Sequence, residues 1–483
     1  MSAATKSGKF TISQYIDSFG VSKFTISIFF LVGLAMMFDG YDYMIISYTN
    51  TQIMQEFFGP SGNDALKGAL SSWSTIGIVV GSFAAGPLSD KFGRRKILTI
   101  GTFMYGLLTI PCIFAPTYEI FAVFRVLAGL FLGVCTPIVT TLFTEFTPTK
   151  QRSFFITFGM AWMIVGWVVA ALVGTVMVQI ATWHWCYAIG ALPVIYAFIF
   201  GKFTPESAHW AAVHGKLDLA VSTLERIHKR AGKPTPYVLA PENILVPPVA
   251  AKSSPAEVWK GKYLKTTIAL VVIYFAGNFS IYGVNAWLPA LMLEATGGAV
   301  TASYMLAMAQ NAASVVANCT TGFVSEAMGR KRNLIFGYGL SVVACLIVSQ
   351  VVKLPAETSF WPYLIAFVFM GFALNYAITA AQPMMSESYP TEFRNSGVAT
   401  IVALGKSAGI LSPIILGGLK AAGWAFSPLI ALLAAPMAFG FLAGFLLPKG
   451  AKGMNIDDIA DEAHDTAQPS SGVASDDVAG SKA

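Results

Sequence analysis

The stretch GPLSDKFGRRK, residues 86–96, decides the fold because its pattern occurs a second time later in the chain. Residues 322–332 read GFVSEAMGRKR, with Gly, an acidic residue, Gly and basic residues in the same order, 236 positions further on. A second pair of segments, EFTPTKQR at 145–152 and ESYPTEFR at 387–394, is separated by 242 positions. Landmarks repeated in the same order predict two related halves, an arrangement common in membrane transport proteins.

The composition indicates a membrane protein. The 483 residues are 55% hydrophobic and only 12% charged, whereas soluble domains carry about 25% charged residues. A soluble protein with an unusually large core is the alternative. Apolar stretches long enough to cross a hydrocarbon core of about 30 Å recur along the chain. We therefore predict an all-α integral membrane fold of twelve transmembrane helices in two pseudo-symmetric six-helix bundles. The expected helices are 24–49, 68–89, 96–116, 118–145, 153–180, 184–204, 264–293, 300–323, 333–352, 361–387, 396–419 and 424–447.

Four segments follow from this pattern. We expect an N-terminal bundle at 1–204, a cytoplasmic linker with short helices at 205–262, a C-terminal bundle at 263–448 and a disordered cytoplasmic tail at 449–483. The linker contains a proline-rich run, and the tail is polar and poor in aromatic residues. The first residues show no signal-peptide core or cleavage site, so the first span is expected to remain as an anchor.

The basic residues predict the orientation in the membrane. Of the 31 Lys and Arg, 26 fall in the N-terminal segment, the even-numbered loops and the tail. The positive-inside rule then places both termini in the cytoplasm, and we expect the protein in a plasma membrane, the inner membrane of a bacterium. All five cysteines lie within expected spans without metal-ligand spacing, which favours a packing role over a metal site.

The repeated loop motif resembles that of the major facilitator superfamily, and PESAHW at 205–210 resembles the end of helix six in its sugar porters and organic-acid symporters. The resemblance covers nearly the whole chain and implies transport by alternating access. It also implies a cytoplasmic gate in which carboxylates pair with arginines or with helix N-termini. The alternative is that the arginines only fix the topology. The expected gate residues are Gly86, Asp90, Gly93, Arg94, Arg95, Glu145 and Arg152, with Glu326, Arg330, Glu387 and Arg394 in the second half.

Two carboxylates lie inside the first apolar segment. Asp39 and Asp42 are three residues apart, so they share one face of a helix, and Gly40 between them allows another backbone to approach closely. A charge at membrane depth costs about 2.5 to 3.5 kcal/mol on insertion scales, which requires an inward orientation. Arg125 lies at a similar depth in the fourth span. Because helices one and four line the central cavity in the superfamily, we expect Asp42 to face Arg125 across a wet passage, with Asp39 one turn deeper.

Such a cluster can couple substrate and protons. Burial raises the pKa of a carboxyl group and a nearby arginine lowers it. A substrate anion that engages Arg125 would deprive the aspartates of their partner, and they would then take up a proton more readily. We therefore predict proton coupling by Asp39 and Asp42 and substrate binding by Arg125. The alternative is a static ion pair that braces the first bundle.

Two further segments narrow the resemblance. DGYD at 39–42 and NAWLPALM at 285–292 are similar to the aromatic acid:proton symporter family, and Arg125 matches its helix-four arginine. That family imports benzoate-like acids with protons. The resemblance implies import of an organic, in particular an aromatic, carboxylate, driven by the proton gradient without a cofactor. The expected partners are the organic anion, protons and the lipid bilayer, with no nucleic acid, and the protein is expected to be a monomer.

Other residues could contact such a substrate. Lys406, inside the eleventh span, is a candidate second anchor for a carboxylate, or a lysine that reaches the surface or pairs with a neighbouring helix. Aromatic and amide side chains of the seventh and tenth spans suit a flat ring with hydroxyl and carboxylate groups, although each could equally be a packing contact. These are Tyr274, Asn278, Tyr282, Asn285, Trp287, Asn375, Tyr376 and Gln382.

Competing functions fit less well. A sugar or polyol porter would not need Arg125 and Lys406 in the membrane, and the glutamine pair of sugar porters is missing from the seventh span. A drug or metabolite exporter of the superfamily would carry a Gly-Pro motif in its fifth helix, which has no proline here. An enzyme is not expected, because the spans hold one histidine, His184, and no cluster of catalytic or metal-binding residues. A receptor would need a recognisable output domain.

Overall fold

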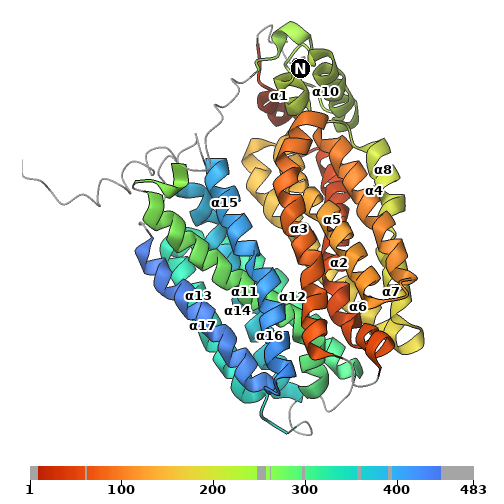
Figure 1. Ribbon diagram of the computed structural model, residues 1–483. Coiled ribbons are helices and arrows are strands. Elements are labelled where there is room, and N and C mark those ends of the chain that lie inside the picture. The colour runs from red at the N-terminus through yellow and green to blue at the C-terminus, as the bar shows by residue number, and fades with distance from the viewer. Residues whose placement is uncertain are drawn as a thin grey trace, which may run out of the picture.

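The computed structural model describes residues 9–59, 63–246, 257–261, 263–295, 300–355, 360–389 and 394–447, and its regular elements are almost entirely helical. Two bundles follow each other along the chain, drawn from red to yellow and from green to blue in Figure 1. The first bundle contains α2 (Lys23–Phe58), α3 (Asp64–Phe92), α4 (Arg94–Ile113), α5 (Tyr118–Phe146), α6 (Arg152–Ile180), α7 (Trp183–Gly190) and α8 (Pro193–Phe203). The second contains α11 (Tyr263–Ala295), α12 (Val300–Met328), α13 (Arg330–Val351), α14 (Phe360–Glu387), α15 (Arg394–Lys406), α16 (Ala408–Ala421) and α17 (Phe426–Leu446).

These helices confirm the predicted twelve-span fold. Ten described segments are long and apolar enough to cross a membrane, and a shorter apolar segment, Ala161–Met177, lies within α6. The remaining span is α12, which is 29 residues long and less apolar because it buries Gln310, Asn311 and Ser314.

Two of the twelve spans, Trp183–Phe203 and Gly397–Ala421, are continuous apolar segments as the sequence predicted, although a short turn interrupts each of them. The sixth divides into α7 and α8 at residues 191–192, because Pro193 has no backbone N–H to donate and instead opens α8 at its first turn. The eleventh divides into α15 and α16 at Ser407, which lies between the small residues Gly405 and Gly409. Leu192 and Ser407 keep helical backbone angles, and their carbonyls accept from the N–H groups of Tyr196 and Leu411, so both interruptions are slight.

The second glycine in each copy of the repeated motif has a geometric reason. Gly93 has φ 103° and Gly329 has φ 85°, a backbone region that side chains rarely tolerate. Each glycine forms the sharp connection between one transmembrane helix and the next. Gly93 connects α3 to α4, and Gly329 connects α12 to α13. The motif therefore encodes a tight reversal at the same end of both bundles.

The two halves meet at the ends of their helices that lie away from α10 (Leu217–Ala231). The hydroxyl of Ser72 in α3 donates to the carbonyl of Ile410 in α16 at 2.9 Å. Nearby, a Cβ atom added to Gly68 would lie only 2.3 Å from the carbonyl oxygen of Pro413, so α3 and α16 touch backbone to backbone. Figure 1 shows the bundles diverging toward the opposite end.

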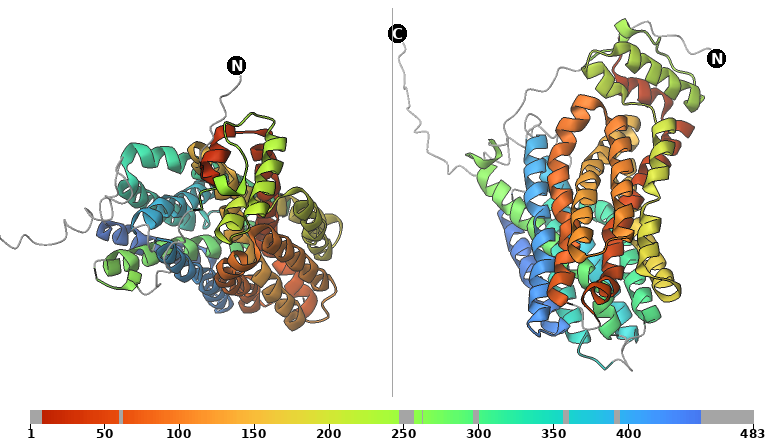
Figure 2. Two further views of the ribbon diagram at one scale, coloured as in Figure 1. Left: turned by 90° about the horizontal axis from the view of Figure 1, so that it is seen from above. Right: turned by 45° about the vertical axis from the view of Figure 1, so that its right-hand side comes forward.

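A small helical subdomain covers one end of the first bundle (Figures 1 and 2). It combines α1 (Ile12–Phe19), α9 (Ala208–Val213) and α10, with short 3-10 turns at Thr149–Gln151 and Pro241–Asn243, whereas the turn Glu257–Trp259 packs on α11 of the second bundle. Phe10 pairs with Ile244 through backbone hydrogen bonds, which ties the N-terminal segment to the stretch after α10. The expected tail at 449–483 and the end of the proline-rich run, residues 247–255, lie outside the described residues. The domain boundaries at 204, 262 and 448 stay predictions.

Candidate functional site

Arg125 of α5 and Asp42 of α2 form a bidentate ion pair. The Nη1 atom lies 2.8 Å from Oδ1 and the Nη2 atom donates to Oδ2 at 2.9 Å. Nη2 also donates to the backbone carbonyl of Asp42 at 3.2 Å. Two parallel charge-assisted bonds of this kind are the strongest arrangement that a guanidinium makes with a carboxylate. The structure confirms the predicted facing of these two residues.

Further groups complete the surroundings of Arg125. Its Nε atom donates to the hydroxyl of Ser74 in α3 at 3.0 Å, and its guanidinium carbon lies 5.6 Å from the ring centroid of Tyr187 in α7. The side chains of Arg125 and Asp42 are 0% and 2% exposed. Solvent therefore does not reach the pair in this conformation, which differs from the wet passage expected from the sequence, because four helices close around the two charges.

Small residues let those helices approach. A Cβ added to Gly129 of α5 would lie 2.3 Å from the carbonyl oxygen of Ser74, and one added to Gly77 of α3 would lie 2.1 Å from that of Val126. Gly40, between the two aspartates, packs on α6 in the same way, at 2.0 Å from the carbonyl oxygen of Met163. Close backbone contacts of this type are typical of helix pairs in membranes. They hold α3 against α5, the helices of Ser74 and Arg125, and α2 against α6.

Asp39, one turn from Asp42, has different partners. The hydroxyl of Thr136 in α5 donates to its Oδ2 atom at 2.7 Å, and the residue is buried. The sequence reading missed Thr136. It follows Arg125 by eleven residues, which is about three helical turns, so it shares the face of α5 that carries Arg125. This spacing could have predicted Thr136 as a residue of the same site.

Lys406 comes from the opposite half. It is the last residue of α15, directly before the turn at Ser407, and its side chain is partly exposed. Lys406 and Asp39 are close enough to interact electrostatically, which places charges of opposite sign on the two facing bundles. The side chain predicted as a second anchor therefore lies near the predicted proton-coupling residue.

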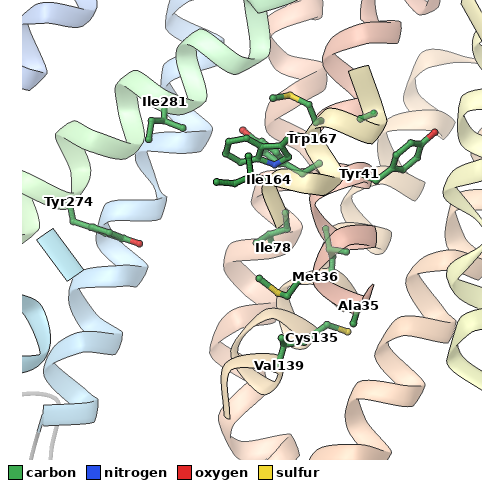
Figure 3. Packing of buried hydrophobic residues seen from close by; sticks show 14 of the residues in the cluster. Ala35, Met36, Tyr41, Ile78, Cys135, Val139, Ile164, Trp167, Tyr274 and Ile281 are labelled. Atoms are coloured by element: carbon green, nitrogen blue, oxygen red, sulfur yellow. The ribbon is translucent and has the colours of Figure 1, made fainter. Parts of the chain in front are cut away.

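Two tyrosines of α11 frame this region. Tyr274 packs against Gly405, where an added Cβ would lie 2.4 Å from the ring, and Tyr282 packs against Gly409 in the same manner at 2.7 Å. The ring of Tyr282 also meets that of Tyr43 in α2, with centroids 5.1 Å apart. Figure 3 shows the ring of Tyr274 pointing from α11 toward the first half, where Ile78 and Met36 are labelled. The two tyrosines thus contact the eleventh span on either side of Lys406 and Ser407.

Three amides and a tryptophan of the predicted set have defined surroundings. Asn278 donates to the carbonyl of Tyr274 at 2.7 Å within α11, and Asn375 donates to Ser314 at 2.8 Å. Asn285 Nδ2 and Trp287 Nε1 are buried without a hydrogen-bond partner in the part of the chain that the structure describes. The two unpartnered donors lie near the contact between the halves, since Asn50 of α2 donates to the carbonyl of Ala286.

The other two predicted contacts are Tyr376 and Gln382 of α14. The hydroxyl of Tyr376 donates to Asn333 of α13, and its ring is buried between helices of the second bundle. The predicted substrate contact of Tyr376 stays a prediction, and its hydroxyl is occupied by Asn333 in this conformation. Gln382 is exposed.

The predicted gate forms a charge network within the first half. Arg94 contacts Asp90 at 2.9 Å and Glu145 at 3.4 Å, which joins α3, α4 and α5. Glu206 accepts from the backbone N–H groups of Arg95 and Lys96, at 2.9 and 3.4 Å, at the start of α4. A carboxylate in that position is stabilised by the helix dipole. Glu206 was missed, although it is the acidic residue of PESAHW.

The remaining gate residues add little to this network. The Arg95 side chain donates to the carbonyl of Gly201, Arg330 Nη1 lies 3.2 Å from the hydroxyl of Ser325, and Gly86 has open space around it. Among the side chains that the structure describes, no ion pair joins the two halves. The side chains of Arg152, Glu326, Glu387 and Arg394 lie outside the described ones.

The family profile described as "Sugar (and other) transporter" matches residues 28–460, most of the chain. The chain belongs to this family of transporters. It is a membrane transporter and not an enzyme.

Curated relatives of this transporter are named for aromatic acids. The chain is 30% identical to the niacin transporter NiaP of Acinetobacter baylyi over 412 residues, which cover 83% of the chain and 88% of the relative. It is 26% identical to the 4-hydroxybenzoate transporter PcaK of the same organism, covering 92% and 95% of the two chains. It is also 26% identical to a gallate transporter of Pseudomonas putida, covering 89% and 94%.

The fold of this transporter is also known from solved structures. A partially occluded inward open conformation of the xylose transporter XylE from E. coli superimposes with a TM-score of 0.72, covering 90% of the chain and all of XylE, at 17% identity. An inward open conformation of XylE gives 0.68. At this identity the likeness establishes the twelve-helix fold alone.

Proposed function

We propose that this transporter imports an organic carboxylate, in particular an aromatic acid, together with protons. The relatives transport niacin, 4-hydroxybenzoate and gallate by their names, and all three are small aromatic carboxylic acids. The observation that carries the proposal is the arrangement of charges along one face of α2. Asp42 is paired with Arg125 of its own half, whereas Asp39 lies near Lys406 of the other half.

This arrangement provides a coupling route. Lys406 is the partly exposed cation of the site, and a substrate carboxylate that binds it competes with Asp39 for the same positive charge. A carboxylate that loses its counter-charge at membrane depth is neutralised by a proton. Substrate and proton would then enter the site together, and the neutral cluster would allow the halves to change their contact.

Arg125 has a second place in the same scheme. Its guanidinium is saturated by Asp42 and Ser74, so a substrate reaches it only after Asp42 is released by protonation. The proposal therefore keeps Arg125 as a substrate-binding residue, which becomes available once Asp42 is protonated. No cofactor is needed in this scheme, because the proton gradient supplies the driving force.

The geometry of the halves supports alternating access. With the α10 end in the cytoplasm, as the distribution of basic residues indicates, the contact between Ser72 and Ile410 closes the outer side. The diverging ends in Figure 1 then face inward. We propose a monomer in the inner membrane of a bacterium, with both termini cytoplasmic.

Uptake by the purified protein in proteoliposomes tests the proposal. An imposed proton gradient, acidic outside, should drive accumulation of radiolabelled nicotinate, 4-hydroxybenzoate, gallate or benzoate above equilibrium. Dissipating the gradient with a protonophore should abolish accumulation and leave substrate counterflow intact. Equal counterflow of xylose and glucose without any carboxylate transport would instead show a sugar porter. Carboxylate transport that never exceeds equilibrium would remove the proton coupling and keep the substrate class.

A further inference from the structure

A pocket of about 410 Å³ lies at the α10 end of the first bundle, away from the charges of the transport site. It opens between the start of α2, the end of α8 and the last turn of α10. In the orientation proposed above, this is where α2 enters the bilayer from the cytoplasm. Its walls are Lys23, Phe24, Ser27, Leu31, Phe203 and Arg230.

The pocket is basic at its rim and apolar inside. Lys23 is the first residue of α2, and Leu31 follows eight residues later, about 12 Å further along the helix axis. Phe203 at the end of α8 is exposed, and so is Phe30, which precedes Leu31 in α2. The hydroxyl of Ser27 donates to the carbonyl of Lys23 and is therefore already occupied. A ligand for this pocket would be anionic at one end and apolar at the other.

The cations at the rim are not neutralised. Arg230 donates to the carbonyl of Phe203 at 2.7 Å and Arg226 to that of Lys202 at 2.9 Å. Within the described part of the chain, no carboxylate lies at ion-pair distance from Lys23, Arg226 or Arg230. Burial, together with the charge of Arg230, lowers the pKa of Arg226. Positive charges that lie close together and contact only neutral carbonyl groups attract an anion.

We propose that this pocket binds the headgroup of an anionic phospholipid from the adjoining leaflet. Lys23 and Arg230 contact the phosphate, and Leu31 and Phe203 contact the first acyl carbons. Basic pockets at the cytoplasmic side of transmembrane helices suit such headgroups. The apolar depth favours a lipid over an acidic peptide, because a peptide would leave Leu31 and Phe203 without an apolar partner. The proposal does not depend on the transported substrate.

Native mass spectrometry of the purified full-length protein tests this site. The protein is equilibrated in detergent with phosphatidylglycerol or with phosphatidylcholine of identical acyl chains, and bound lipids are counted. The expected result is a preference for phosphatidylglycerol that falls about 25-fold in the double variant Lys23→Gln with Arg230→Gln, since each basic residue near an anionic headgroup contributes about fivefold. The matched control is Lys150→Gln with Lys229→Gln, two exposed cations of the same end, which should keep the preference.

Several results would overturn the proposal. One is equal binding of the two lipids by the unmodified protein, and another is an equal loss of preference in both double variants. Inorganic phosphate that displaces phosphatidylglycerol at equal concentration would identify a free anion as the ligand. If the Lys23 and Arg230 changes alter protease cleavage within the acidic stretch 455–465 but not lipid binding, the pocket belongs to that segment. Thermal unfolding temperatures measured for both variants show whether each is folded.

Discussion

Arg125 holds Asp42 through two parallel hydrogen bonds of 2.8 and 2.9 Å, in surroundings where both side chains are almost completely removed from solvent. A buried pair of this kind is strongly coupled, because removal of one partner leaves the other as an uncompensated charge. Variants of Asp42 and Asp39 can therefore separate the effect of breaking this ion pair on stability from the effect of losing a proton-binding carboxylate on uptake.

Replacing Asp42 by Asn should lower stability and abolish accumulation. The unpaired Arg125 should cost about 3 to 5 kcal/mol in free energy of unfolding, as for other buried ion pairs. The double variant Asp42→Asn with Arg125→Gln removes both charges and should recover much of the thermal stability without restoring uphill uptake. A double variant that accumulates substrate normally would show that the pair only braces the bundle.

Replacing Asp39 by Asn should separate coupling from binding. Asp39 accepts from Thr136, and among the described side chains none forms a bidentate pair with it, so an amide of the same shape should leave the fold intact. We expect counterflow to persist and gradient-driven accumulation to disappear. Thr136→Val, which removes the hydrogen bond but keeps the carboxylate, serves as the comparison and should accumulate substrate. Uphill uptake at the unmodified level by the Asp39→Asn protein would end the assignment.

Replacing Lys406 by Met should raise the KM for aromatic carboxylates by about tenfold or more, since a hydrogen bond to a charged group contributes about 1.5 to 3 kcal/mol. Lys406→Arg should recover part of the affinity. Lys353→Met, which removes an exposed lysine after α13, is the control and should leave KM unchanged. Initial uptake rates over a range of substrate concentrations give the KM. An unchanged KM in the Lys406→Met protein would place the carboxylate elsewhere.

Replacing Gly68 by Ala should shift the protein out of the conformation described here. An added Cβ would collide with the carbonyl of Pro413 at 2.3 Å, so α3 and α16 could no longer close on each other. Spin labels at the outer ends of these helices should report a longer mean distance. Gly418→Ala on α16 is the matched control, since nothing lies within 4 Å of its Cβ. Identical distance distributions in the two variants would argue against a closed outer gate at this crossing.

Much of the fold could be predicted because its signals are local. The length of an apolar run predicts a membrane span. The glycines at 93 and 329 predict tight reversals of the chain, because glycine tolerates the positive φ that both positions adopt. The packing of the eleventh span around Ser407 could not be predicted, because Gly405, Ser407 and Gly409 are also ordinary residues of a membrane helix. Their meaning depends on Tyr274 and Tyr282, which lie on another helix.

The sequence by itself determined the two halves, the helices that compose them and the presence of charges at membrane depth. Those features follow from hydrophobic length and from a repeated pattern of glycine, acidic and basic residues. Only the tertiary structure decided that Asp42 is sealed with Arg125 while Asp39 lies near Lys406 of the opposite half. The physical reason is that a charge in the membrane must find a partner, and which partner it finds depends on how helices far apart in the chain pack together.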